Sequence, residues 1–382
     1  MKYRTFGKTG CQVSQLGFGC MRFPTVDGTP FSGEIKEEEA CRMVRYAIDA
    51  GVNYIDTAYN YHSGCSEKVL GRILQDGYRE KVYLATKSPT FLMKEEADFD
   101  RFLNEQLERL QTSYIDFYLL HALDSDKWEN VVLKFRLLDK LEAARAAGKI
   151  RFIGFSFHDD YPAFQTILHG YDGWDFCQIQ LNYIDTNYQA GLQGLADAAA
   201  KGLGVVIMEP LLGGKLATPP LQLAKALPDS KTPVRWGLEY LWNRPEVSLV
   251  LSGMSSMAQI EENLAIAATA APQILSSNDL AILDQARTIF QTMALVPCTQ
   301  CSYCMPCPCG LNIPTIYQLY NRSACERDLK KVTEDYFALT TPAAECVQCG
   351  ICQGLCPQHI AGQEWMPQVE EFFQKTREKL EK

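Results

Sequence analysis

The chain has 382 residues, of which 47% are hydrophobic and 22% are charged, and its 46 acidic and 37 basic residues give a formal net charge of −9. This composition is typical of a folded protein with a sizeable core, and it excludes collagen-like, coiled-coil and wholly disordered chains. The charge disfavours general nucleic-acid binding and attraction to anionic membranes. We expect a cytoplasmic location, because no apolar run reaches the ~20 residues of a membrane span and the first residues lack a secretory signal.

Short apolar runs alternate with longer amphipathic stretches from residue 11 onward. The runs that we predict as strands are Leu16–Met21, Val52–Asp56, Val82–Lys87, Ile115–His121, Arg151–Phe157, Phe176–Leu181, Gly204–Glu209 and Val247–Ser252. The stretches that we predict as helices include Glu37–Ala50, Glu67–Leu74, Ala97–Leu110, Val132–Ala147, Leu192–Ala200 and Pro233–Trp242. Strands that alternate with helices over ~250 residues predict a closed (β/α)8 barrel of TIM type. A doubly wound open sheet is the alternative, disfavoured because no G-x-G-x-x-G motif follows the first strand.

Two more predicted helices, Gln259–Ala271 and Asn278–Gln291, follow the last strand and precede a cysteine-rich region. Ten of the fifteen cysteines lie in that region: Cys298, Cys301, Cys304, Cys307, Cys309, Cys325, Cys346, Cys349, Cys352 and Cys356. Cytosolic thiols stay reduced, so such crowding indicates metal binding and not disulfides. We therefore predict a barrel domain over 1–292 and a metal-binding domain with a charged C-terminal tail over 293–382.

Four polar residues stand at or just after the ends of the second, third and fourth predicted strands. They are Asp56, Tyr61, Lys87 and His121. The C-terminal strand ends of such a barrel share one mouth, where catalytic residues gather. A tyrosine hydroxyl is a better acid when an ammonium fixed by a carboxylate lies beside it, and a neutral histidine can donate a hydrogen bond to a carbonyl oxygen. Each residue alone also fits a structural role, but the four together predict carbonyl reduction.

Several motifs, in their order and spacing, resemble the aldo/keto reductase family over about residues 1–290. They are Leu16-Gly17-Phe18-Gly19, Asp56-Thr57-Ala58-x-x-Tyr61, Ser66-Glu67-x-x-Leu70-Gly71, Ala85-Thr86-Lys87, Asp116-x-x-x-x-His121 and Glu262-Asn263-Leu264. The resemblance implies a barrel that binds NAD(P)H across its mouth and transfers hydride, with Tyr61 as general acid. It also implies that Ser156 and Gln178 hold the nicotinamide carboxamide and that Glu262 and Asn263 contact adenine.

Some positions depart from the family pattern. Met208 stands where an aromatic residue often stacks on the nicotinamide. Where the family commonly has Ser-Asn after the fifth strand, this chain reads Ser156-Phe157-His158 and so lacks the amide. Gly253 and Gln259 stand where NADPH-preferring members tend to place a lysine and an arginine for the 2′-phosphate. Phosphate is normally recognised by fixed cations, so NADH, NADPH and flavin all stay open as cofactors.

The cysteine spacing points to iron-sulfur clusters. Cys346-x-x-Cys349-x-x-Cys352-x-x-x-Cys356-Pro357 matches the C-x2-C-x2-C-x3-C-P run of bacterial ferredoxins, and Cys298 to Pro308 nearly repeats it. In this pattern the fourth cysteine reaches the other cluster. One 4Fe-4S cluster would then use Cys298, Cys301, Cys304 and Cys356, and the other Cys346, Cys349, Cys352 and Cys307, with Cys309 as the alternative to Cys307. Zinc is the disfavoured alternative metal.

The cysteine-rich region resembles a two-cluster ferredoxin domain, so the whole chain resembles the ferredoxin-type branch of the aldo/keto reductase family. Nicotinamide passes two electrons as hydride and a 4Fe-4S cluster passes one, so coupling needs a converter such as flavin. We predict hydride transfer between NAD(P)H and a small-molecule carbonyl or alcohol, with structural or peripheral clusters. The alternative is that the clusters exchange single electrons with a flavin, or with a ferredoxin or flavoprotein partner. A purely electron-transfer module is disfavoured by the intact tetrad.

Overall fold

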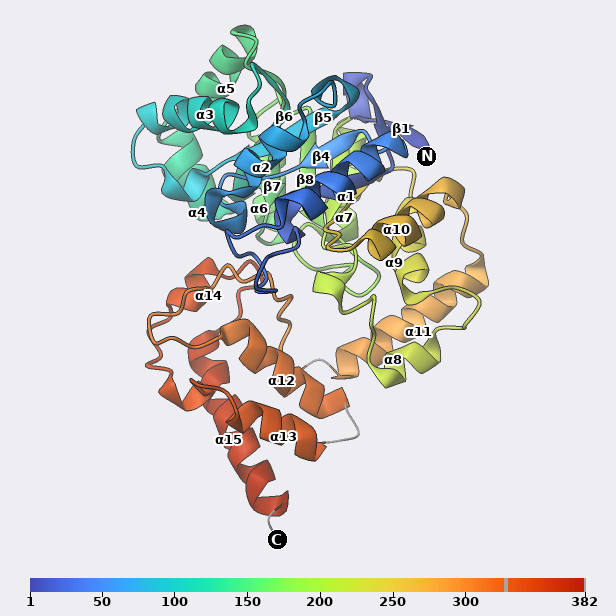
Figure 1. The fold of residues 1–382 in the computed structure, drawn as a ribbon, viewed down its shortest axis with the longest axis vertical. Coiled ribbons are helices and arrows are strands. Elements are labelled where there is room, and N and C mark those ends of the chain that lie inside the picture. The colour runs from blue at the N-terminus through green and yellow to red at the C-terminus, as the bar shows by residue number, and fades with distance from the viewer. Residues whose placement is uncertain (294, 326–328, 381–382) are drawn as a thin grey trace. The chain divides into compact units, whose positions relative to one another are not determined.

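The computed structural model describes residues 1–293, 295–325 and 329–380 (Figure 1). The chain forms two compact units, which we describe separately. The barrel unit comprises Met1–Pro210 and Gly237–Leu275, and the cysteine unit comprises Leu211–Trp236 and Ser276–Lys382. Within the described ranges, every helix is too short or too polar to cross a membrane.

The barrel unit contains eight parallel strands that close in the order β10-β3-β4-β5-β6-β7-β8-β9. The strands are β3 (Leu16–Gly19), β4 (Tyr54–Asp56), β5 (Tyr83–Ser88), β6 (Ile115–Leu123), β7 (Ile150–Phe157), β8 (Phe176–Gln180), β9 (Gly204–Met208) and β10 (Leu249–Ser252). All eight predicted strands are confirmed, within a few residues at their ends, and closure excludes the open sheet.

Helices cover the outside of the barrel (Figure 1). They are α1 (Glu37–Asp49), α2 (Ser66–Ile73), α3 (Ala97–Leu110), α4 (Ser125–Lys127), α5 (Leu137–Ala146), α6 (Tyr161–His169), α7 (Gly191–Ala200), α10 (Met257–Thr269) and the part of α9 (Pro233–Trp242) from Gly237 onward. The predicted helix over Val132–Ala147 begins too early: Trp128–Leu133 is a π-helical segment, and Arg136, with φ 52°, interrupts it before α5.

A hairpin of β1 (Tyr3–Thr5) and β2 (Gln12–Ser14), which we did not predict, packs against residues of several barrel strands through Phe6, Cys11 and Val13. The Phe6 ring lies 4.7 Å from Phe117 and 5.6 Å from Phe176, measured between ring centroids. At Gly7, with φ 51°, a Cβ atom would lie 2.2 Å from the Gly204 nitrogen, so only glycine fits there. The hairpin thus covers the N-terminal end of the barrel and leaves the C-terminal strand ends for a site.

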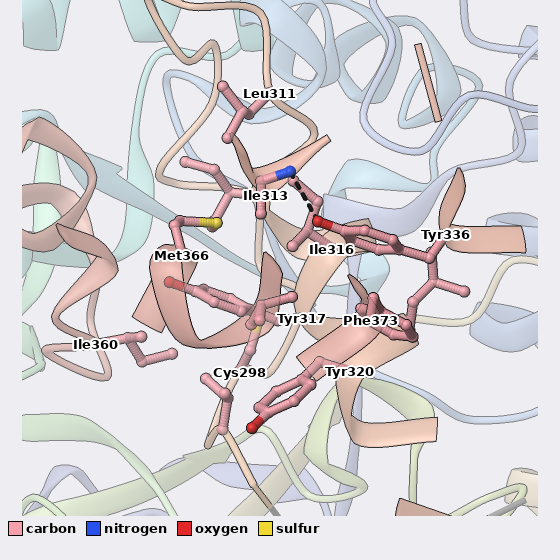
Figure 2. Close-up of a cluster of buried hydrophobic side chains, with 14 of the residues drawn as sticks. Cys298, Leu311, Ile313, Ile316, Tyr317, Tyr320, Tyr336, Ile360, Met366 and Phe373 are labelled. Atoms are coloured by element: carbon pink, nitrogen blue, oxygen red, sulfur yellow. Dashed lines mark hydrogen bonds between the residues drawn. The ribbon is translucent and has the colours of Figure 1, made fainter. Parts of the chain in front are cut away.

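The cysteine unit is helical and contains no strand in its described residues. Its helices are α8 (Leu221–Ala226), α11 (Ser277–Met293), α12 (Ile313–Cys325), α13 (Leu329–Phe337), α14 (Ile351–Leu355) and α15 (Gly362–Leu380). Its core is apolar (Figure 2), and the Tyr336 and Phe373 rings stack in it at 4.0 Å. A ferredoxin-like fold is therefore not confirmed. The charged tail is mostly α15, whose Met366, Val369 and Phe373 are buried.

The two compact units do not divide at residue 293. Ser276 and the whole of α11 belong to the cysteine unit, as does the Leu211–Trp236 segment that follows β9. Within this unit the Lys215 ammonium donates a hydrogen bond to the Cys298 carbonyl oxygen, and Lys231 forms a 3.6 Å ion pair with Asp279 of α11. Part of the chain expected to belong to the barrel domain therefore packs with the cysteine-rich region.

Candidate functional site

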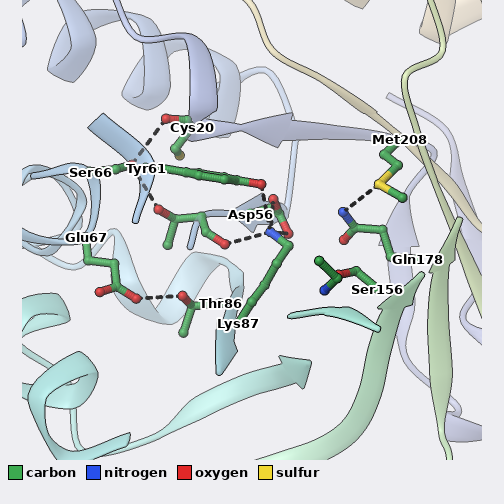
Figure 3. Close-up of polar contacts among 12 residues, drawn as sticks. Cys20, Asp56, Tyr61, Ser66, Glu67, Thr86, Lys87, Ser156, Gln178 and Met208 are labelled. Carbon is green, nitrogen blue, oxygen red and sulfur yellow. Dashed lines mark hydrogen bonds and ion pairs between the residues drawn. The ribbon is translucent and has the colours of Figure 1, made fainter. Parts of the chain in front are cut away.

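Asp56, Tyr61, Lys87 and His121 come together at the C-terminal ends of β4, β5 and β6. All four are buried, with at most 8% of any of them exposed. The Lys87 Nζ atom donates hydrogen bonds to both Asp56 carboxylate oxygens, at 2.7 and 2.8 Å, and lies 3.4 Å from the Tyr61 hydroxyl. Figure 3 shows the Lys87 ammonium next to both the Asp56 carboxylate and the Tyr61 hydroxyl. The predicted tetrad is one contiguous cluster.

The charges in this cluster are held out of water. Burial raises the pKa of the Asp56 carboxyl, and the Lys87 ammonium opposes that rise. The Lys87 ammonium also bonds to the Thr57 carbonyl oxygen at 2.7 Å, so its protons all have acceptors. A buried ammonium with this many hydrogen bonds is fixed in place. Because the dielectric constant of the buried site is low, its positive charge interacts strongly with the nearby Tyr61 hydroxyl.

His121 is a neutral imidazole at neutral pH. Burial lowers the pKa of His121 well below its usual value, and the charges of Lys87, His158 and Lys127 lower it further. The buried Nδ1 atom forms no hydrogen bond with any residue that the structure describes. The ring faces Tyr61 edge-on, with centroids 6.2 Å apart. His121 can therefore offer a single N–H to a substrate oxygen without carrying a charge.

A second set of buried polar residues supports the tetrad. The Glu67 carboxylate accepts hydrogen bonds from Thr86 (2.7 Å) and Gln106 (2.6 Å) and lies 3.3 Å from Arg109. Gln106 also donates to the Lys87 carbonyl oxygen at 3.0 Å. The network ties the backbone of β5 to α2 and α3, which fixes Lys87. The Ser66-Glu67 motif belongs to the family resemblance, but only the structure shows this role.

The residues predicted to hold the nicotinamide lie at the ends of β7, β8 and β9 (Figure 3). The Ser156 hydroxyl accepts a hydrogen bond from the Ala122 N–H at 2.7 Å. The Gln178 amide nitrogen lies 3.7 Å from the Met208 sulfur. The Gln178 Oε1 atom is buried and has no hydrogen-bond partner in the described part of the chain.

The residues predicted to hold the adenosine part lie around the start of α10. Gly253 follows β10, and Gln259, Glu262 and Asn263 are on the helix. Asn263 is buried and donates to the Ser252 hydroxyl at 2.9 Å, while the Gln259 side chain accepts from the Ser255 N–H at 2.8 Å. Glu262 is half-buried. The fold thus places these four residues beside one another.

Arg22 lies next to this second group and was missed by sequence reasoning. A Cβ atom on Gly253 would lie 3.1 Å from the Arg22 Cδ atom, so the arginine side chain runs along the glycine. Arg22 follows β3, which pairs with β10 in the closed barrel. A cation is therefore present where Gly253 and Gln259 lack one. The missing signal was barrel closure, which brings the first and last strands together.

His62, directly after Tyr61, joins two loop segments. Its Nε2 atom accepts a hydrogen bond from the Phe23 N–H (3.1 Å) and its Nδ1 atom donates to the Ser32 carbonyl oxygen (2.7 Å). The residue is 1% exposed and has φ 52°. Burial lowers the pKa of His62, which keeps the ring neutral and able to accept from Phe23.

Replacing His62 with alanine should lower the free energy of unfolding by about 1–3 kcal/mol, because the buried Phe23 N–H loses its acceptor. It should also change the pH dependence. A buried histidine with a lowered pKa loses stability as the pH falls from ~6.5 toward that lowered pKa, since only the unfolded chain takes up the proton. Denaturant unfolding between pH 5 and 8 would test this. His121 contributes to the same slope in both proteins, so an identical slope in the variant would contradict the role of His62.

The cysteine unit contains two hollows lined by cysteine side chains. The cysteines around the first hollow are Cys298, Cys301, Cys304, Cys352 and Cys356. Those around the second hollow are Cys304, Cys307, Cys309, Cys346, Cys349 and Cys352. Cys304 and Cys352 border both, so the hollows are adjacent. The side chain of Cys325 lies outside the described part of the structure.

The pKa shifts of the thiols reflect the same two groups of cysteines. Burial raises the pKa of Cys304, and so do the charges of its neighbours Cys301, Cys298, Cys356 and Cys352. Burial also raises the pKa of Cys352, and so do its neighbours Cys346, Cys349 and Cys307. No group of three or more His, Cys, Asp or Glu side chains among the described residues is placed to hold a metal ion. The cysteine residues line the two hollows.

Comparison with known proteins concerns the barrel. The model of the aldo/keto reductase family matches residues 15–287. L-galactose dehydrogenase of Arabidopsis thaliana is 30% identical over 289 residues, which are 69% of this chain and 88% of that protein. An aldo-keto reductase from Bacillus halodurans in its holo form is 25% identical, with a TM-score of 0.63 over 75% of this chain and 96% of that one. An aldo-keto reductase from Klebsiella pneumoniae in complex with NADPH is 25% identical, with a TM-score of 0.60 over 74% and 94% of the two chains.

Proposed function

Because this chain belongs to the aldo/keto reductase family, and is therefore an oxidoreductase, we propose that it transfers hydride between NAD(P)H and a small carbonyl or alcohol substrate. The observation that carries this proposal is the buried Lys87 ammonium, which contacts both Asp56 and the Tyr61 hydroxyl. This arrangement is suited to moving a proton at the mouth of the barrel.

Tyr61 is the proposed general acid. A phenol with a usual pKa of about 10 gives up its proton reluctantly at neutral pH. The Lys87 ammonium stabilises the phenolate that forms, and Asp56 holds the ammonium in place. Tyr61 would give its proton to the substrate oxygen during carbonyl reduction and take one back during alcohol oxidation. Neutral His121 would donate a hydrogen bond to the same oxygen and stabilise its developing negative charge.

The nicotinamide cofactor, when bound, supplies or accepts the hydride. The residues present fit it, because the buried Gln178 Oε1 atom can accept a hydrogen bond from the carboxamide N–H2 group. Ser156 lies on the neighbouring strand. The aldo-keto reductase from Klebsiella pneumoniae, which is known in complex with NADPH, supports this class of cofactor for the chain.

Arg22 is proposed to supply the cation that Gly253 and Gln259 lack. Replacing Arg22 with glutamine should raise the Kd for NADPH roughly 10–100-fold, since a charge-assisted hydrogen bond is worth about 1.5–3 kcal/mol. Arg22→Lys should retain most of the affinity, because it keeps the charge. Fluorescence titration of both variants with NADPH and NADH would measure this. Unchanged NADPH affinity in Arg22→Gln would contradict the assignment, and an equal loss for NADH would place Arg22 on the diphosphate and not on the 2′-phosphate.

The activity is tested with anaerobically purified protein. It would be mixed with NADPH or NADH and a panel of aldehydes, ketones and sugars, while the absorbance of the reduced cofactor is followed. Sugars belong in the panel because a relative is named for L-galactose. Turnover of at least one carbonyl or alcohol is expected. Failure to bind either nicotinamide would overturn the proposal.

We further propose that the two hollows hold 4Fe-4S clusters. The support is that each hollow is lined by the four cysteines that the spacing assigns to one cluster. Four thiolates around one zinc ion would converge to about 2.3 Å from the metal. The thiols here instead border spaces, which suits a cubane of several atoms. Either cluster, when bound, exchanges one electron at a time. Iron and acid-labile sulfide analysis of anaerobic protein tests this, and zinc without iron would overturn it.

The second candidate function is single-electron exchange between the clusters and a flavin, or a ferredoxin or flavoprotein partner. The observation that favours it is the adjacency of the two hollows, which share Cys304 and Cys352, together with the exposure of Cys349. Cluster EPR recorded after addition of NADPH distinguishes the two functions. Reduced clusters would favour electron exchange, and oxidised clusters during steady carbonyl turnover would favour a structural role.

A further inference from the structure

Two of the residues that line the first hollow carry a buried hydroxyl group. They are Thr299, between Cys298 and Cys301, and Tyr317 of α12. Each residue is 2% exposed, and neither hydroxyl forms a hydrogen bond with any residue that the structure describes. Burying a hydroxyl without a partner is unfavourable, so two such groups at one hollow imply an acceptor inside it.

The Tyr317 hydroxyl lies close to cysteine sulfur. A Cβ atom on Gly362, at the start of α15, would lie 2.5 Å from the Cys352 Sγ atom and 3.4 Å from the Tyr317 hydroxyl. The glycine therefore lets the helix approach the sulfur closely, with the hydroxyl beside it. Figure 2 shows the Tyr317 ring between Met366, Ile360 and Cys298, which hold it from several sides.

The second hollow differs in this respect. Its lining residues include Gln348 and Gln363, but in the described chain none of its polar side-chain atoms is both buried and without a hydrogen-bond partner. The two hollows are thus alike in their cysteines and unlike in the hydroxyl donors around them.

We propose that Tyr317 and Thr299 donate hydrogen bonds to sulfur atoms of the cluster in the first hollow and raise its reduction potential. This inference rests on the proposed clusters. Reduction adds one electron to the cluster, and hydrogen bonds to its sulfur atoms stabilise the more negative state. Removing a donor therefore lowers the potential of this cluster. The potential of the other cluster should fall less, because Cys352 is the one of its four proposed ligands that also borders the first hollow.

The test is an anaerobic redox titration of the full chain, followed by EPR, on Tyr317→Phe and Thr299→Val. Each variant should shift one of the two midpoint potentials downward by more than the other. A tenfold change in the reduction equilibrium corresponds to about 59 mV for a one-electron couple. The control is Tyr320→Phe, which changes a tyrosine on the same helix that lines neither hollow. The control should shift neither potential.

Iron and sulfide are measured on the same samples, so that two failures can be told apart. Wild-type protein without clusters would overturn both the proposed clusters and this inference. Two intact clusters with unchanged potentials in both variants would overturn this inference alone, as would an equal shift of both midpoints. If Tyr317→Phe loses iron, Thr299→Val carries the test. Resonance Raman spectroscopy offers a readout independent of activity. If an Fe–S stretching band is sensitive to deuterium in the wild-type chain and loses that sensitivity in the variant, the inference is supported.

Discussion

Replacing Tyr61 with phenylalanine is expected to lower kcat for carbonyl reduction by roughly 10²–10⁴-fold, the usual contribution of a general acid. The substitution removes one oxygen atom and leaves the ring in place, and the Lys87–Asp56 ion pair keeps its two short hydrogen bonds. Binding of the nicotinamide should therefore be unchanged. Steady-state kinetics together with cofactor titration would show whether the loss falls on kcat and not on cofactor affinity.

A matched control is available on β4. Tyr54 is also buried, and its hydroxyl has no hydrogen-bond partner among the described residues, but it packs near Phe6 at the other end of the barrel. Tyr54→Phe should keep full activity. Carbonyl turnover that survives in Tyr61→Phe would rule out the tetrad mechanism. Lys87→Met is a less clean test, because it leaves the Asp56 carboxylate buried without its partner and should also destabilise the fold by about 3–5 kcal/mol.

The tetrad could be predicted from the sequence because parallel strands share one mouth. Asp56, Lys87 and His121 each close a short apolar run, and the order of the runs is enough to bring the strand ends together. Arg22 needed closure of the barrel, which no local pattern encodes. His62 forms hydrogen bonds with backbone groups of Phe23 and Ser32. Such partners cannot be recognised from the sequence, because they do not depend on the residue type.

Some helices and strands were not predicted from the sequence, and in most cases there is a physical reason. The strands of the β1–β2 hairpin have three residues each, which is too few to show the alternation of apolar and polar residues that marks a strand. Helix α6 carries a start signal, since Asp160 accepts from the Ala163 N–H and Pro162 stands in the first turn, and this capping pattern was overlooked. In the cysteine unit the spacing of the proposed ligands can be seen in the sequence, but the fold cannot be predicted from it. Helix α14 is only five residues long, and the other elements depend on tertiary packing.

The second large effect concerns Cys307 and Cys309, which both border the second hollow. Cys307→Ala is expected to remove the cluster held with Cys346, Cys349 and Cys352, lowering the iron content from about eight to about four atoms per chain. Cys309→Ala should leave about eight. The reason is that Cys307 is followed by a proline, as in the ferredoxin run. Iron and sulfide analysis with EPR of both variants measures the difference.

The same pair of variants also tests how the cysteine unit is held together. A metal site that forms only in the folded state adds its binding free energy to folding, so loss of one cluster should lower the unfolding temperature of this unit. The barrel tetrad lies in the other compact unit, and nicotinamide binding should survive in Cys307→Ala. If Cys307→Ala kept the iron of this cluster and Cys309→Ala lost it, Cys309 and not Cys307 would be the fourth ligand. Full iron in both single variants would mean that either thiol can serve, and the double variant would then lose the cluster.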